Sequence, residues 1–290
     1  MKKIGLIILT LPFMLASVFG QDEQFLDKKG RVVLPESGDW ALGFNAVPIF
    51  TFIGNTFNGS TSNNHMGNDK FAGFTENTIL GKYFLSDKKA IRVNFRFGVH
   101  NKNVTNDIVN DFLNNPDSLV LDRAKFKTSN FNLGLGHEWR LGKGRLQGVV
   151  GGEVFFQYTS SVKSQFEYGN AFAAGNVTPL TTLWDPSGFA ITANSVGERI
   201  LSSKGGGKCG FGARLFAGVE YFVAPKISLG AEFGWYLGYS QQSKSTVTYE
   251  RWSTLDNASY EVTREKSGNK YFDADTDNFG GGIYLIFHFQ

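Results

Sequence analysis

The chain has 290 residues, of which 15% are aromatic and 35 are glycine, and its mean hydropathy is only -0.18. This mixture is too polar for a helical membrane protein and too aromatic for a disordered one. The 29 basic residues nearly balance the 26 acidic ones, and that balance excludes nucleic acid as an expected partner.

Residues 1–20 predict a cleavable secretory signal peptide, because Lys2 and Lys3 are followed by a long apolar run. The alternative is a membrane-anchoring helix. It is disfavoured because Pro12 interrupts the run, which is also shorter than the ~20 residues that a membrane span needs. We therefore expect an exported mature chain that begins at Gln21.

After this segment the sequence alternates with a period of two. In the clearest stretch, residues 227–239, apolar residues occupy the odd positions and mainly small or polar residues the even ones. In a membrane barrel the apolar face contacts lipid and the opposite face lines the lumen. Most of the predicted strands reach the ~9 to 11 residues of a tilted membrane strand. There are eight of them, at residues 40–53, 77–85, 90–99, 131–141, 145–158, 211–223, 226–239 and 278–289.

The connections between these strands alternate strictly between short and long. This arrangement places all the short turns on one side of the sheet, as in outer-membrane barrels with periplasmic turns and extracellular loops. A soluble Greek key has no reason to sort its loops in this way. The short turns are residues 86–89, 142–144 and 224–225, and the four long loops are residues 54–76, 100–130, 159–210 and 240–277.

The sequence therefore predicts an all-β fold, an antiparallel transmembrane β-barrel of eight strands over residues 39–290. A periplasmic segment, residues 21–38, precedes it. A ten-stranded barrel that takes two further strands from residues 159–210 is the alternative.

The last strand carries a family resemblance. From Phe279 to Phe289 the odd positions are apolar or glycine up to the chain end, where Gln290 follows. The chain resembles the OmpA/OmpX-like class of small outer-membrane barrels. This resemblance implies residence in the outer membrane of a Gram-negative bacterium, contact with outer-membrane lipid, and recognition of the C-terminal strand by the barrel-assembly machinery.

The inward positions of the predicted strands carry charges of both signs. An eight-stranded barrel is just wide enough for side chains to fill it, and an unpaired buried charge costs several kcal/mol. We expect these charges to pair and to fill the lumen; the alternative is a narrow, porin-like small-solute pore or a transport or assembly accessory. The predicted lumen charge network is Lys82, Arg92, Arg96, Glu138, Arg140, Glu153, Arg214, Glu220 and Glu232.

No catalytic, cofactor-binding or metal-binding residue is predicted, and we do not expect an enzyme. The inward carboxylates have arginine neighbours that favour a structural role over hydrolysis. The histidines at positions 65, 100, 137 and 288 lack zinc spacing. The aspartates at 273, 275 and 277 are not followed by the glycine and glutamate of a calcium loop.

The long loops carry the remaining functional signal. Residues 243–252 and 260–266 predict a protruding two-stranded ribbon, and residues 162–168 a second one. Trp184, Trp252 and Tyr260 are the candidate contacts for a surface protein partner, since exposed strand edges and aromatic side chains bind partners by strand addition. We expect a surface structural or interaction protein; a passive surface loop is the other interpretation.

Overall fold

The computed structural model describes residues 25–46, 79–113, 115–184, 190–276 and 283–290. Within these ranges the regular structure consists of antiparallel strands, which confirms the predicted all-β fold. No helix there has the length and apolar character of a membrane span.

Antiparallel pairings connect one set of strands in a ring. The order is β1, β2, β3, β4, β5, β10, β11 and β15, and β15 pairs back with β1. The ring is uneven, because β1 has 6 residues and β4 has 23. The bounds are β1 Trp40–Asn45, β2 Ile79–Ser86, β3 Lys89–Val109, β4 Leu119–Leu141, β5 Leu146–Thr159, β10 Lys208–Ala224, β11 Ile227–Gln242 and β15 Ile283–Phe289.

Each predicted strand overlaps one strand of the ring, and the three short turns lie where expected. The prediction of a loop at residues 100–130 is wrong, because β3 and β4 stay paired as far as Val109 and Leu119. The outward side chains there are largely polar, so the outward apolar pattern of the ring is lost while the strands continue. Several predictions fall outside the described residues: the signal peptide, residues 47–53 and 277–282, and the loop at 54–76.

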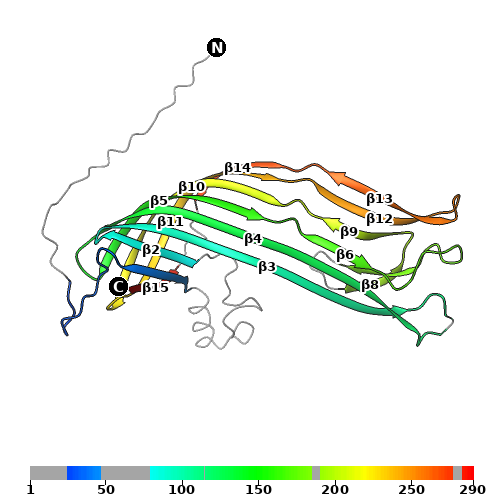
Figure 1. Ribbon diagram of the computed structural model, residues 1–290, viewed down its shortest axis with the longest axis horizontal. Helices are drawn as coiled ribbons and strands as arrows, with labels where there is room; N and C mark the ends of the chain where they lie inside the picture. The colour runs from blue at the N-terminus through cyan, green and yellow to red at the C-terminus, as the bar shows by residue number, and fades with distance from the viewer. Residues whose placement is uncertain (1–24, 47–78, 114, 185–189, 277–282) are drawn as a thin grey trace, which may run out of the picture.

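Beyond the ring the sheet continues as an open, curved surface, which we call the extension (Figure 1). It consists of residues 100–109 of β3 and 119–129 of β4 with four further strands. The predicted pairing in the ribbon is confirmed as β12–β13, but β12 also pairs with β9, so the ribbon is joined to the larger sheet. β6 and β9 pair above the contact between β4 and β5, so they lengthen the sheet and do not widen the ring to ten strands. The added strands are β6 Lys163–Glu167, β9 Glu198–Lys204, β12 Ser245–Ser253 and β13 Ala258–Lys266.

One position in the ring is shared by two strands, β14 (Lys270–Thr276) and β15. β14 pairs with the upper part of β11, from Trp235 to Gln241, while β15 pairs with its lower part. The two strands therefore occupy the same position beside β11.

A separate hairpin packs on the extension. β7 (Leu180–Trp184) and β8 (Ala190–Ser195) form their own two-stranded sheet. The Thr182 amide donates to Asp122 Oδ2 on β4 at 2.8 Å, and Asn106 Nδ2 on β3 donates to Thr182 Oγ1 at 3.1 Å. Because Asp122 and Thr182 are both buried, the hairpin covers one face of the extension.

A buried arginine joins this hairpin region to the ribbon. Arg199 pairs with Glu250 at 2.8 Å and donates to the Asn170 carbonyl at 2.6 Å. Its guanidinium lies 4.6 Å from the ring centre of Tyr168, whose hydroxyl donates to the Ile200 carbonyl. Burial raises the pKa of Tyr168, so the phenol stays protonated at neutral pH and keeps this hydrogen bond.

The ring has an apolar outer face. On β3, Ile91, Phe95 and Phe97 are exposed, whereas Ala90 and Arg92 on either side of Ile91 are buried. We call the exposed apolar side chains of the ring strands the apolar belt. It includes Trp40, Leu42, Ile91, Val93, Phe95, Phe97, Val99, Leu135, Trp139, Val154, Phe156, Tyr158, Leu215, Val219, Trp235 and Leu237.

The belt ends sharply along β3 and β4. On the same outward face, Val99 is followed by Asn101 and Asn103, and their partners on β4 are Lys127 and Lys125. The pairing of β3 with β4 has no irregularity along its length, so alternate residues keep facing the same side. The outer face is therefore apolar on the ring and largely polar on the extension.

The segment before β1 packs against the turn end of the ring. Val33 is buried, and its carbonyl accepts from the Lys226 amide in the turn between β10 and β11 at 3.2 Å. Lys226 Nζ pairs with Asp39 at 2.5 Å, and the Phe84 amide donates to the Asp39 carbonyl at 2.9 Å. Residues 25–39 are thus held across this end.

Candidate functional site

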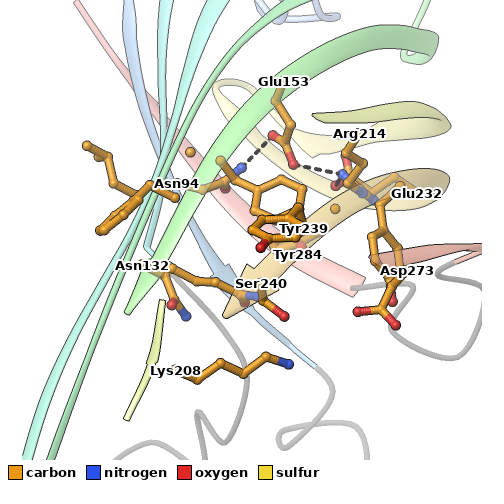
Figure 2. Close-up of a pocket in the computed structure, with 17 residues that line it drawn as sticks. Asn94, Asn132, Glu153, Lys208, Arg214, Glu232, Tyr239, Ser240, Asp273 and Tyr284 are labelled. Atoms are coloured by element: carbon orange, nitrogen blue, oxygen red, sulfur yellow. Dashed lines mark hydrogen bonds and ion pairs between the residues drawn. The ribbon is translucent and has the colours of Figure 1, made fainter. Parts of the chain in front are cut away.

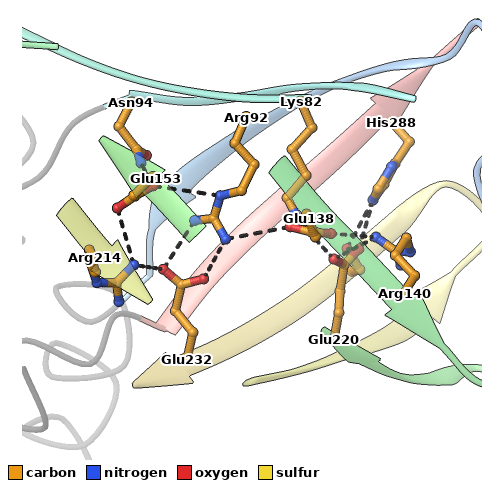
Figure 3. A network of polar contacts seen from close by, with 11 residues as sticks. Lys82, Arg92, Asn94, Glu138, Arg140, Glu153, Arg214, Glu220, Glu232 and His288 are labelled. Atoms are coloured by element: carbon orange, nitrogen blue, oxygen red, sulfur yellow. Dashed lines mark hydrogen bonds and ion pairs between the residues drawn. The ribbon is translucent and has the colours of Figure 1, made fainter. Parts of the chain in front are cut away.

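Four cations and four carboxylates meet inside the ring, and we call them the inner charge cluster (Figure 3). Their charges cancel. They come from six strands: Lys82 on β2, Arg92 on β3, Glu138 and Arg140 on β4, Glu153 on β5, Arg214 and Glu220 on β10, and Glu232 on β11.

The half of the cluster nearer the short turns is almost completely buried. Lys82 Nζ lies 2.9 Å from Glu138 Oε2 and 3.0 Å from Glu220 Oε2. Arg140 Nη1 bonds the same two carboxylates at 3.2 and 3.0 Å. Because β2 and β10 are not neighbours in the ring, the contact of Lys82 with Glu220 crosses its interior.

The other half is centred on Glu232. Arg92 binds this carboxylate with both terminal nitrogens, at 2.8 and 3.1 Å. Arg214 Nη1 bridges Glu232 and Glu153 at 3.1 and 3.3 Å, and Asn94 donates to Glu153 at 2.6 Å. The two-point contact gives a planar guanidinium a fixed orientation.

Arg96 is the predicted network residue that does not join the cluster. The strand register places Arg92, opposite Gly136, in the row of Glu153. Arg96 lies four residues further along β3, opposite Asn132. Among the described residues it has no ion pair, because this position lies away from the carboxylates of the cluster. The sequence could not show this, since counting residues along each strand does not give the stagger between strands.

The sequence reading missed His288 as a member of this group. His288 Nε2 lies 3.1 Å from Glu220 Oε1 and 3.0 Å from Ser228 Oγ, and all three residues are buried. A catalytic triad would have the carboxylate on the other ring nitrogen and an accessible serine. The signal was present in the alternation, because Phe287 and Phe289 are belt-side positions on either side of His288.

A cavity of about 530 Å³ lies above the inner charge cluster, toward the extension (Figure 2). Glu153, Arg214 and Glu232 line it where it meets the cluster. Ser240 also lines it, and its buried hydroxyl has no hydrogen-bond partner among the described residues. The remaining lining is largely polar and includes Asn94, Asn132, Gln157, Lys208, Tyr236, Tyr239, Asp273 and Tyr284.

The comparisons with known proteins gave no match, whether to a family model, a curated protein or a solved structure. The resemblance to small outer-membrane barrels rests on the strand pattern of this chain. Within the described part of the chain, no group of three or more His, Cys, Asp or Glu side chains is placed to hold a metal ion.

The three aromatic partner candidates do not form one surface. Trp184 ends β7, whereas Trp252 and Tyr260 lie on the ribbon of β12 and β13. Tyr260 pairs with Arg251, so Trp252 faces the opposite side of the ribbon. Of the three, Tyr260 is exposed, and Trp184 and Trp252 are half-buried.

Proposed function

We propose that the ring spans the outer membrane of a Gram-negative bacterium as an eight-stranded barrel. Its short turns lie in the periplasm and its extension lies outside the cell. One observation carries this proposal, the contrast between the two faces of the ring. Trp40, Phe97 and Leu215 on the outer face are 61%, 65% and 66% exposed, while Arg92 and Glu138 on the inner face are 1% and 0% exposed.

This distribution of side chains favours lipid around the ring. Soluble monomers rarely expose a contiguous apolar patch larger than a few hundred Å². A membrane barrel has an outward apolar band and a polar interior. The ring strands β5, β10 and β11, with 14, 17 and 16 residues, are also longer than the ~9 to 11 residues that a span requires.

We propose further that the barrel serves as an anchor and the extension as a surface for a protein partner. β4 has 23 residues, about twice what a membrane span needs, so its upper half has no role in crossing the bilayer. β13 pairs with β12 on one side and with no other strand among the described residues. Its free edge of backbone groups suits strand addition.

A labelling experiment on β3 tests the membrane assignment. Cys209 is first changed to serine, and a new cysteine is placed by Phe97→Cys or by the matched control Asn103→Cys on the same outward face. A membrane-impermeant maleimide on intact cells should label position 103 and leave position 97 unlabelled. Position 97 should become reactive once the membrane is dissolved in detergent and the protein is denatured. Equal labelling of both positions in intact cells would contradict a lipid-covered ring.

A further inference from the structure

Three lysines lie side by side on the outer face of the extension. Lys127 on β4 pairs with Lys163 on β6, and Lys163 pairs with Lys204 on β9. Paired residues point to the same side of a sheet, and Lys127 shares the outward face of β4 with Trp139 and Leu135. We call these three residues the lysine row. All three are exposed.

The lysine row lacks compensation within the protein. No ion pair joins any of its members to a described residue. Like charges directly opposite one another on neighbouring strands destabilise a sheet. Next to the row on the same face of β4, Lys125 and Arg123 share the single carboxylate of Glu167, at 2.7 and 3.8 Å. These five cations and one carboxylate leave a local charge of +4.

The height of the lysine row relative to the apolar belt indicates the binding partner. Lys127 lies four residues along β4 from Phe131, a distance of about 14 Å in an extended strand. Phe131 contacts Phe95 and Phe156 of the belt, with ring centres 5.9 and 6.3 Å apart. Beyond an apolar band of this kind lie the polar headgroups of the surrounding lipid. Long lysine side chains also reach along a surface to bring their ammonium groups to that level.

We propose that the lysine row binds the phosphate groups of the outer-leaflet lipids next to the barrel, on the side where β4 passes into the extension. This inference rests on the proposed membrane function. Bound phosphates would offset the repulsion between the three ammonium groups. They would also tie the base of the extension to the membrane surface, because β4, β6 and β9 are adjacent strands of the extension.

The test uses the full chain purified in neutral detergent. Its variant carries Lys127→Gln, Lys163→Gln and Lys204→Gln. The matched control carries Lys28→Gln, Lys29→Gln and Lys143→Gln, which remove three exposed lysines from the turn end. Binding is measured by native mass spectrometry and by titration with a bisphosphorylated glycolipid (lipid A), with its dephosphorylated form, and with inorganic phosphate as a competitor.

We expect the variant to bind the bisphosphorylated lipid more weakly by a factor on the order of a hundred. Each lysine near an anionic surface contributes roughly a fivefold increase in affinity, and the variant lacks three of them. The control and the wild type should bind alike, and the dephosphorylated lipid should not distinguish the proteins. Unchanged lipid binding by the variant overturns the inference. Full competition by millimolar inorganic phosphate overturns it too, because the site would then be one for free phosphate.

The two proposals fail in separable ways. Labelling at position 97 in intact cells argues against the membrane barrel itself. Protection at position 97, together with a folded variant that keeps its affinity for the phosphorylated lipid, argues against the lysine row alone. Folding of the variant is checked by the shift in gel migration between unheated and heated samples.

Discussion

Individual residues of the inner charge cluster depend on one another. Glu220 accepts from Lys82 and Arg140 at 3.0 Å each and from Ser228 at 2.7 Å. Taking such charges out of water is costly, and their mutual attraction compensates only when every partner is present. We therefore expect the loss of one member to reduce the stability of the protein more than the loss of a complementary pair.

The change Glu220→Gln tests this dependence, because it keeps the shape and removes one negative charge. We expect the free energy of unfolding to fall by about 3 to 5 kcal/mol, as when one partner of a buried ion pair is removed. Denaturant unfolding of the protein in detergent measures it. Glu261→Gln on the exposed strand β13 is the control, and surface changes of this kind stay within about 0.5 kcal/mol.

The double variant Lys82→Met with Glu220→Gln completes the measurement. It restores charge balance, so its loss of stability should be smaller than the sum of the two single losses. Additive losses would show that Lys82 and Glu220 do not stabilise each other across the ring.

At the scale of elements, β4 joins two different structures. Its residues from Asn130 to Leu141 pair with β5 in the ring, and its residues from Arg123 to Lys127 pair with β6 in the extension. The strands β12 and β13 pair only with β9 and with each other among the described residues. The ribbon therefore contributes to the extension and adds no pairing to the ring.

Removal of the ribbon should leave the ring folded. The Gln242 amide donates to the Asn269 carbonyl at 2.7 Å, so the chain already converges at the base of the ribbon. Replacing residues 245–266 by an Asn-Gly turn should preserve the gel shift on heating and the protection of position 97 from labelling. Loss of the heat-sensitive folded form would show that the ribbon is needed for folding of the ring.

For the whole molecule, we expect the inner charge cluster to decide whether the ring conducts. The cavity on the extension side meets Glu153, Arg214 and Glu232, and the more deeply buried half of the cluster lies beyond them. At the turn end, residues 25–39 pack across the opening through Val33 and Asp39. A path through the ring would have to displace both.

We therefore expect no stable open-pore conductance from the purified protein in planar lipid bilayers. The measurement separates a filled anchor from a small-solute pore. Long-lived conductance steps at neutral pH would favour the pore and would contradict a filled interior. A denatured sample reconstituted in the same way is the control for leakage caused by detergent.

The sequence alone was enough to predict the all-β fold, the positions of the ring strands and their short turns, because a period of two is a local property of each strand. It also indicated which residues face inward: Lys82, Arg92 and Glu220 occupy the positions opposite the apolar ones. The same alternation contained His288, whose inward position follows from its two phenylalanine neighbours.

Only the tertiary structure decided which inward residues meet. Arg92 rather than Arg96 reaches the row of Glu153, because contacts inside a ring depend on the stagger of several strands together. Part of the extension, too, came only from pairing. The sequence indicated β6 and the ribbon, but it predicted a loop where β9 and the upper halves of β3 and β4 pair, because the outward faces there are largely polar. Backbone hydrogen bonds between strands hold these segments, and such bonds carry no signature in the order of the residues.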